Sequence, residues 1–231
     1  MANKKKKKVT RKQLLKEPDE FITFTSKAIR FAIDYKHQIT VGLIGFIILI
    51  LVATGIRYFS NKAEKKAFAL LSQSQTKYES ILKEKGPEKA LAELTKDFER
   101  ILKKYPTKAG GKLARIIYAN MCYKAGNLDK AARLYTESLK DFKSNPFLKN
   151  LILNGLGYVY EDKKDFESAT KYFDMIAAGT HPVMKGQALF NLGRLYAAKG
   201  DRDKSIAAYR QLLTDQFDSI YIELVKEKLG S

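Results

Sequence analysis

Apolar residues fill one stretch near the start of the chain, ITVGLIGFIILILVATGIRYF, at residues 39–59. No charged residue falls between His37 and Arg57, and the apolar positions cover every face of a helix. At about 1.5 Å per residue, the 19 residues between them extend roughly 28 Å, close to the hydrocarbon thickness of a bilayer. The rest of the chain is too polar to enclose such a helix, so residues 39–59 are predicted to form a single transmembrane helix.

A stripe of apolar residues with helical spacing precedes this stretch, while Lys27 and Arg30 lie off the stripe. The pattern predicts an amphipathic helix that rests in the membrane interface or packs on a membrane partner, and both interpretations stay open. The stripe consists of Phe21, Phe24, Ala28, Phe31 and Tyr35.

After the apolar stretch a helical pattern continues outward until Gly86-Pro87 breaks it, and a second helix is predicted from residue 88 to Lys104. We interpret residues 60–106 as a helical linker followed by a degenerate half-repeat.

Three sets of residues with the same spacing (3, 6, 3 and 4) then follow, starting 38 and 36 residues apart. Each set spans two helices, and its first, small residue lets the paired helix approach closely. Such pairs leave apolar surface uncovered and must stack. Residues 107–231 are therefore predicted to form about three stacked pairs and a capping helix packed through Ile220, Ile222, Leu224, Val225 and Leu229. The sets are Ala119, Cys122, Leu128, Ala131, Tyr135; Gly157, Tyr160, Phe166, Ala169, Phe173; and Gly193, Tyr196, Arg202, Ser205, Tyr209.

The charge is strongly positive, with 43 Lys and Arg against 25 Asp and Glu, and residues 1–38 alone carry eleven basic and four acidic residues. A basic segment before a span is held in the cytoplasm, so residues 1–38 are predicted inside and residues 60–231 outside. The long basic segment and the lack of a small-residue cleavage site indicate an uncleaved anchor. The lysine-rich head sets topology or contacts anionic lipid; an RNA or ribosome contact is the alternative. Nucleic acid is not an expected partner, because no aromatic platform accompanies the lysines.

The chain offers little for catalysis. No Ser, His and Asp set, phosphate-binding glycine loop or paired carboxylates stand out, and His37 and His181 lie far apart. We expect no enzymatic activity, no cofactor, no metal site and no small-molecule substrate. The lone Cys122, in the helical stretch YANMCYKAG, is interpreted as a small core residue.

A partner-binding groove is predicted on the concave side, where the first helix of each pair lies. Amide and aromatic side chains dominate this side, and both suit contact with an extended peptide. Phe190 also fits an inter-repeat core position. Tyr158 and Arg194 occupy equivalent positions in successive pairs and are expected to be exposed, with no part in the helix crossings. The predicted groove residues are Asn120, Tyr123, Asn154, Tyr158, Phe190 and Arg194.

These features place the chain in the all-α class, as one transmembrane helix followed by a solenoid that resembles the tetratricopeptide repeat. The stretch NLGRLYAAKGDRDKSIAAY is the closest match to that repeat, although the periods exceed the usual 34 residues and the helix-start tryptophan is missing. With its basic arm and span, the chain also resembles the ancillary subunit of the bacterial SecYEG translocon.

The second resemblance implies a single-pass protein of the bacterial inner membrane with a periplasmic C-terminal domain. It further implies contact with translocon subunits, periplasmic chaperones or newly translocated proteins. Contact with membrane lipid through residues 21–59 is expected from the apolar stripe and the span themselves. The alternative is an assembly scaffold of another envelope machine for secretion, pilus assembly or polysaccharide export.

Overall fold

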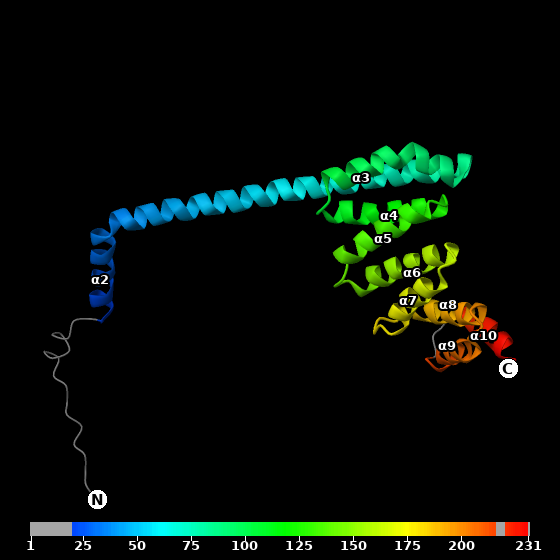
Figure 1. Cartoon of the computed structure of the whole chain (residues 1–231). Coiled ribbons are helices and arrows are strands. Elements are labelled where there is room, and N and C mark those ends of the chain that lie inside the picture. The colour runs from blue at the N-terminus through cyan, green and yellow to red at the C-terminus, as the bar shows by residue number, and fades with distance from the viewer. Residues whose placement is uncertain (1–19, 216–219, 231) are drawn as a thin grey trace, which may run out of the picture. The chain divides into compact units, whose positions relative to one another are not determined.

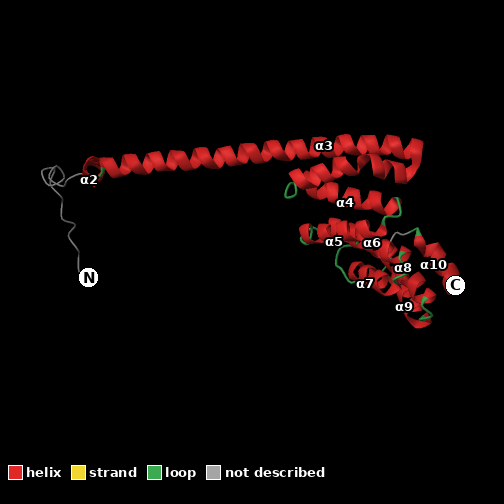
Figure 2. Ribbon diagram, turned by 45° about the horizontal axis from the view of Figure 1, so that its top comes forward, coloured by secondary structure: helices red, strands yellow, loops and turns green. Residues whose placement is uncertain are grey.

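A computed structural model describes residues 20–215 and 220–230, and every regular element within these ranges is an α-helix (Figures 1 and 2). The chain divides into two compact units, residues 1–60 and 61–231. The predicted all-α class is confirmed. The helices are α2 (Glu20–Asp34), α3 (Lys36–Lys104), α4 (Ala109–Lys124), α5 (Leu128–Asp141), α6 (Pro146–Asp162), α7 (Phe166–Ala177), α8 (Lys185–Ala198), α9 (Arg202–Thr214) and α10 (Tyr221–Leu229).

The first unit holds α2 and the beginning of α3, which includes the predicted span. The most apolar window of α3 has a mean hydropathy of 2.7, and none of it is buried within the protein. Thr40 and Thr54, the polar exceptions, donate their hydroxyls to the carbonyls of Lys36 and Ile50 at 2.7 Å. Length and composition make this helix a candidate membrane span.

Helix α3 contains a sharp break at Gly86, whose φ of 80° and ψ of 174° are not helical, followed by Pro87. Glycine tolerates this positive φ and proline restarts a helix, so the chain turns back on itself there (Figure 1). The two arms of α3 pack through apolar stripes and carry the ion pair between Lys85 and Glu93 at 3.0 Å. Residues 61–104 therefore form a helix pair of their own. The stripes are Ala67, Leu71, Ser74, Tyr78 and Ile81, and Ala90, Leu94, Phe98 and Ile101.

Helix α4 begins against this pair in a close backbone approach. The backbone N–H groups of Ala109 and Gly110 donate to the two carboxylate oxygens of Glu64 on α3, at 3.2 and 2.9 Å. A Cβ added to Gly110 would lie 2.8 Å from the backbone nitrogen of Phe68, so only glycine fits there. The negative side chain thus supplies the cap that Lys108 at the helix start does not provide.

The remaining helices stack as pairs: α4 on α5, α6 on α7 and α8 on α9, with α5–α6 and α7–α8 contacts between them. Small residues mark the crossings, as the spacing predicts. A Cβ on Gly157 would lie 2.5 Å from the ring of Phe173, and one on Gly193 would collide with the ring of Tyr209. The hydroxyl of Ser205 donates to the Gly193 carbonyl at 2.7 Å, which ties α9 to α8.

Equivalent turns separate the two helices of each pair. In each turn one residue has a positive φ of 63–79°. The side-chain oxygen of the residue after it accepts a hydrogen bond from the backbone N–H three residues further along the chain. These side-chain caps start the second helix of each pair. The turn residues are Gly126 and Asn127, Lys164 and Asp165, and Gly200 and Asp201.

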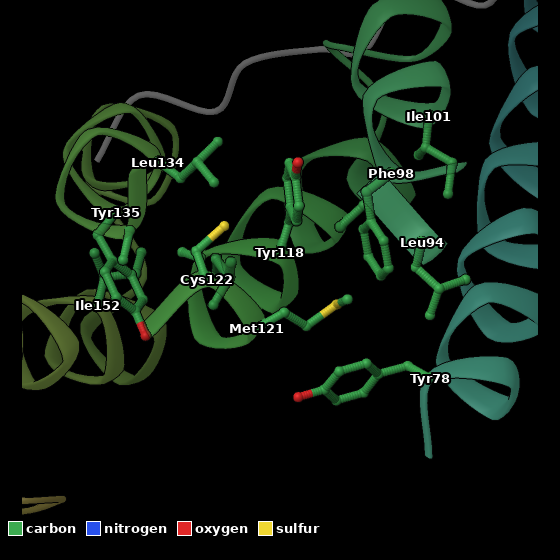
Figure 3. Close-up of a cluster of buried hydrophobic side chains, with 14 of the residues drawn as sticks. Tyr78, Leu94, Phe98, Ile101, Tyr118, Met121, Cys122, Leu134, Tyr135 and Ile152 are labelled. Atoms are coloured by element: carbon green, nitrogen blue, oxygen red, sulfur yellow. The ribbon is translucent and has the colours of Figure 1, made fainter. Parts of the chain in front are cut away.

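The buried apolar side chains of the second unit form two clusters, one from α3 to α6 and one from α6 to α10. Cys122 is fully buried beside Tyr118 and Met121, which confirms it as a core residue (Figure 3). Helix α10 packs on α8 and α9 through the fully buried Val225. Its predicted packing side is only partly correct, because Ile220 is 84% exposed and Leu224 is 45% exposed.

Candidate protein-binding face

The six predicted groove residues lie on the first helices of successive pairs: two on α4, two on α6 and two on α8. Asn120 is exposed and the other five are partly buried. As a binding groove, this set stays a prediction. The structure also shows which other side chains surround these residues.

Tyr158 on α6 is held by two side chains of α8. Its hydroxyl oxygen accepts hydrogen bonds from Gln187 Nε2 at 2.8 Å and from Asn191 Nδ2 at 3.0 Å. Its ring meets that of Phe173 edge to face at 5.5 Å. The polar tip and the ring thus both contact protein, and Tyr158 contributes to the joint between two pairs.

Arg194 on α8 forms a bidentate pair with Glu161 on α6, at 2.5 and 2.8 Å. It also reaches Asn191 Oδ1 at 3.4 Å, which links the pair to the Tyr158 contact. The hydrogen bonds to Glu161 raise the pKa of the Arg194 guanidinium. Tyr158 and Arg194 are therefore bonded between α6 and α8, a contact separate from the small-residue crossings within each pair, and their part in partner binding stays a prediction.

Phe190 lies at the C-terminal end of the same face. Its ring stacks on that of Tyr221 of α10 at 4.6 Å and lies 6.1 Å from that of Tyr209 of α9. Of the two interpretations open for Phe190, the structure supports the core position. Helix α10 thus covers this end of the face.

The N-terminal end of the face is less completely bonded. Asn120 Oδ1 accepts a hydrogen bond from the Tyr135 hydroxyl of α5. Burial and a hydrogen bond to Asp162 raise the pKa of Tyr123 to about 12. Asn154 Oδ1 is buried without a hydrogen-bond partner among the described residues. Of the three predicted residues at this end, Asn154 on α6 thus keeps an unpaired buried oxygen.

Sequence reasoning missed Gln187 and Asn191, which join Tyr158 and Arg194 into one network. The signal was present, because Gln187, Asn191 and Arg194 are spaced four and three apart and form a polar stripe on α8. Glu161 lies three residues after Tyr158 on α6. Complementary stripes on consecutive first helices indicate an inter-pair contact as readily as a binding surface.

Stacked antiparallel helix pairs with small residues at their crossings define an α-solenoid of the tetratricopeptide type. The chain belongs to the family described as tetratricopeptide repeat-like domain, which matches residues 31–231. No match was found among curated proteins.

Three solved structures share this fold with the chain. BtubC (BKLC) from P. vanneervenii is 17% identical, with a TM-score of 0.54, over 75% of this chain and 82% of its own. A putative kinesin light chain from Podospora anserina with nearly identical TPR-like repeats is 14% identical, with a TM-score of 0.56, over 67% and 77%. PilW, described as a widely conserved type IV pilus biogenesis factor, is 16% identical, with a TM-score of 0.52, over 66% and 64%. At these identities the likeness concerns the fold alone.

Proposed function

We propose that the chain is a membrane-anchored, non-enzymatic protein–protein interaction module. The observation that carries this proposal is the family match over residues 31–231, which joins the apolar part of α3 and the stacked helix pairs in one family unit. Tetratricopeptide-like domains generally bind protein partners, because stacked pairs present extended surfaces formed by several helices. Residues 60–106 connect the anchor to the repeats of residues 107–231.

The proposed topology has residues 1–38 in the cytoplasm and residues 60–231 in the periplasm of a bacterial cell. It rests on the net charge of +7 in residues 1–38, from eleven basic and four acidic residues. A reporter that works only in the periplasm, fused after Ser231, should be active, and its cytoplasmic counterpart inactive. The reverse pattern contradicts the topology.

Helix α2 extends the proposed membrane contact. Two large side chains of its predicted apolar stripe are uncovered: Phe24 is 71% exposed and Phe31 is 59% exposed. Lys27 and Arg30 flank this stripe and are suited to anionic headgroups. We place α2 in the membrane interface on the cytoplasmic side, next to the span.

The proposed task is assistance to newly translocated proteins, through contact with the Sec translocon or periplasmic chaperones. This assignment is supported by the order of basic arm, span, helical connection and repeats. A scaffold of another envelope machine is the second candidate, favoured by the fold shared with the pilus biogenesis factor PilW. The two candidates differ in the partner that each requires.

Affinity purification of the full chain from gently solubilised membranes tests the proposal. A chain truncated after Ser60 is the control, because it keeps the first compact unit and lacks the second. Translocon subunits or chaperones recovered only with the full chain support the Sec assignment, whereas secretion, pilus or export components support the scaffold. Equal recovery by the truncated control contradicts a role for the repeats.

A further inference from the structure

A groove of about 230 Å³ lies between the first arm of α3 and α4. Tyr78, Glu79 and Leu82 line it from α3, and Ile117, Asn120 and Lys124 line it from α4. Its volume is below the roughly 300–1,000 Å³ typical of small-molecule sites. The groove belongs to the N-terminal part of the face formed by first helices, where bonding between the pairs is incomplete.

Tyr78 is the unusual residue of this groove. Its side chain is buried, with 8% exposure, and its hydroxyl has no hydrogen-bond partner among the described residues. Figure 3 shows its ring near Met121, with the hydroxyl directed away from α3. Burial raises the pKa of Tyr78, so the phenol stays protonated and is a donor at neutral pH. A buried donor without an acceptor is unfavourable unless a ligand supplies one.

Further hydrogen-bonding groups border the groove. The Tyr135 hydroxyl occupies Asn120 Oδ1, which leaves the Asn120 amide nitrogen available to donate. Lys124 and Glu79 are exposed, and neither takes part in an ion pair within the described residues. Leu82 and Ile117 add apolar surface. Gln75, which also lines the groove, adds an amide that can donate and accept. The groove therefore offers donors, acceptors and an apolar strip, in contrast to the mutually bonded Tyr158 and Arg194.

We propose that this groove between α3 and α4 binds an extended internal segment of a partner polypeptide. The proposal rests on the proposed function and names the surface that carries it. Tyr78, Asn120 and Lys124 donate to carbonyl oxygens of the segment, Glu79 accepts from a backbone N–H, and the apolar strip receives a side chain.

An internal segment fits better than a C-terminal carboxylate. The charge of Lys124 is balanced by that of Glu79 at the same groove, whereas capture of a carboxylate favours several converging cations. A neutral main chain with alternating carbonyl and N–H groups matches the mixed donors and acceptors.

The test uses the full chain in detergent and an array of decapeptides with acetylated N-termini, each made with an amidated and with a free C-terminus. Peptides bound by the parent are measured again with Tyr78→Phe and with Tyr209→Phe, a tyrosine of α9 with a similar exposure of 5%. We expect Tyr78→Phe to weaken binding about threefold to tenfold, the loss typical of one hydrogen bond, without lowering the melting temperature. Tyr209→Phe should leave binding unchanged. Lys124→Ala, which alters an exposed side chain, should also weaken binding and provides the same test if Tyr78→Phe is destabilised.

Three results overturn the proposal: no peptide binding by the parent at millimolar concentration, binding insensitive to both groove variants, or binding only of peptides with a free C-terminal carboxylate. If the parent chain is a dimer and Tyr78→Phe is not, as measured by light scattering, the proposal is also overturned, because the groove is then occupied by a second copy of the chain.

Repeating the membrane purification with Tyr78→Phe separates the groove proposal from the proposed function. If the parent chain recovers a partner from membranes but binds no peptide, the groove proposal is rejected and the interaction module is kept. If the parent chain recovers no partner at all, the proposed function itself is contradicted.

Discussion

Gly157→Leu tests the crossing between α6 and α7 directly. Gly157 faces the ring of Phe173, which is fully buried, and a Cβ at this position would lie 2.5, 2.7 and 2.8 Å from three ring atoms. Real Cβ atoms essentially never approach so closely. The ring has no solvent to move into, so the two helices must separate to admit the leucine.

The magnitude follows from two opposing contributions. Overpacking a well-filled core costs about 1–3 kcal/mol, and the three short contacts place this site toward the upper value. Replacing glycine by leucine in a helix contributes up to about 1 kcal/mol in the other direction. The expected net loss is about 2 kcal/mol of unfolding free energy. At about 2–4 °C per kcal/mol for a protein of this size, the melting temperature should fall by about 4–8 °C.

Circular dichroism of the full chain in detergent measures this shift. Gly55→Leu is the matched control, because it is the same substitution in the apolar part of α3, where an added Cβ meets nothing within 4 Å. Combining Gly157→Leu with Phe173→Leu should cost less than the sum of the single changes, since the smaller side chain makes room. A melting temperature equal to that of the parent, or strict additivity in the double variant, would refute the crossing as described.

Three further outcomes are expected. Glu64→Ala should lower the unfolding free energy by about 1 kcal/mol, measured by thermal melting, because the first N–H groups of α4 lose their acceptor, while Glu64→Gln should lose less. Burial raises the pKa of Cys122 to about 11, so a thiol reagent at neutral pH should modify it only at the rate of local or global unfolding; immediate labelling would contradict its burial. Hydrogen bonds to Ser168 lower the pKa of Asp165, so its stabilising effect is present above its ordinary pKa of 3.8 and is lost as the pH falls through the lowered value. Melts from neutral to acidic pH should therefore show a smaller acid-induced loss for Asp165→Asn, which keeps a side-chain acceptor, and an identical loss would contradict this assignment.

The stacked pairs were predictable because their signal is steric and local. Gly157 and Gly193 must be small where an aromatic ring crosses, and these positions repeat with the period of the fold. The caps at Asp165 and Asp201 follow the same period. Each of these requirements involves residues within one pair, so each leaves its mark in a short stretch of sequence.

The helix pair formed by the arms of α3 was harder to recognise. The break at Gly86 and the helix end at Lys104 were predicted correctly. The buried stripe of the first arm, however, includes Ala67 and Ser74, so its apolar character is weak, and a linker helix accounted equally well for the pattern. What buries these residues is contact with the second arm and α4, which no local pattern encodes.

The candidate site shows the same limit. A polar stripe such as Tyr158 and Glu161 has the same spacing whether it faces a ligand or a neighbouring helix. Only the positions of Gln187, Asn191 and Arg194 show that the partner is α8. The unpaired hydroxyl of Tyr78 could not be predicted from a local pattern, because its environment is built from two helices about 40 residues apart in the chain.

The order of contacts along the second unit has a consequence for how the chain acquires its structure. Helices pack on those next to them or next but one in the sequence, from the stacking of Phe98 on Tyr118 at 5.4 Å to the contacts of α10 with α8 and α9. Such short-range contacts need little loop closure and form quickly. As the chain emerges from its N-terminal side, the arms of α3 are complete first and offer α4 a finished surface. Each later pair can then close on its predecessor before the next has appeared, so the solenoid assembles in the direction of synthesis, and α10 packs on α8 and α9 after they have formed.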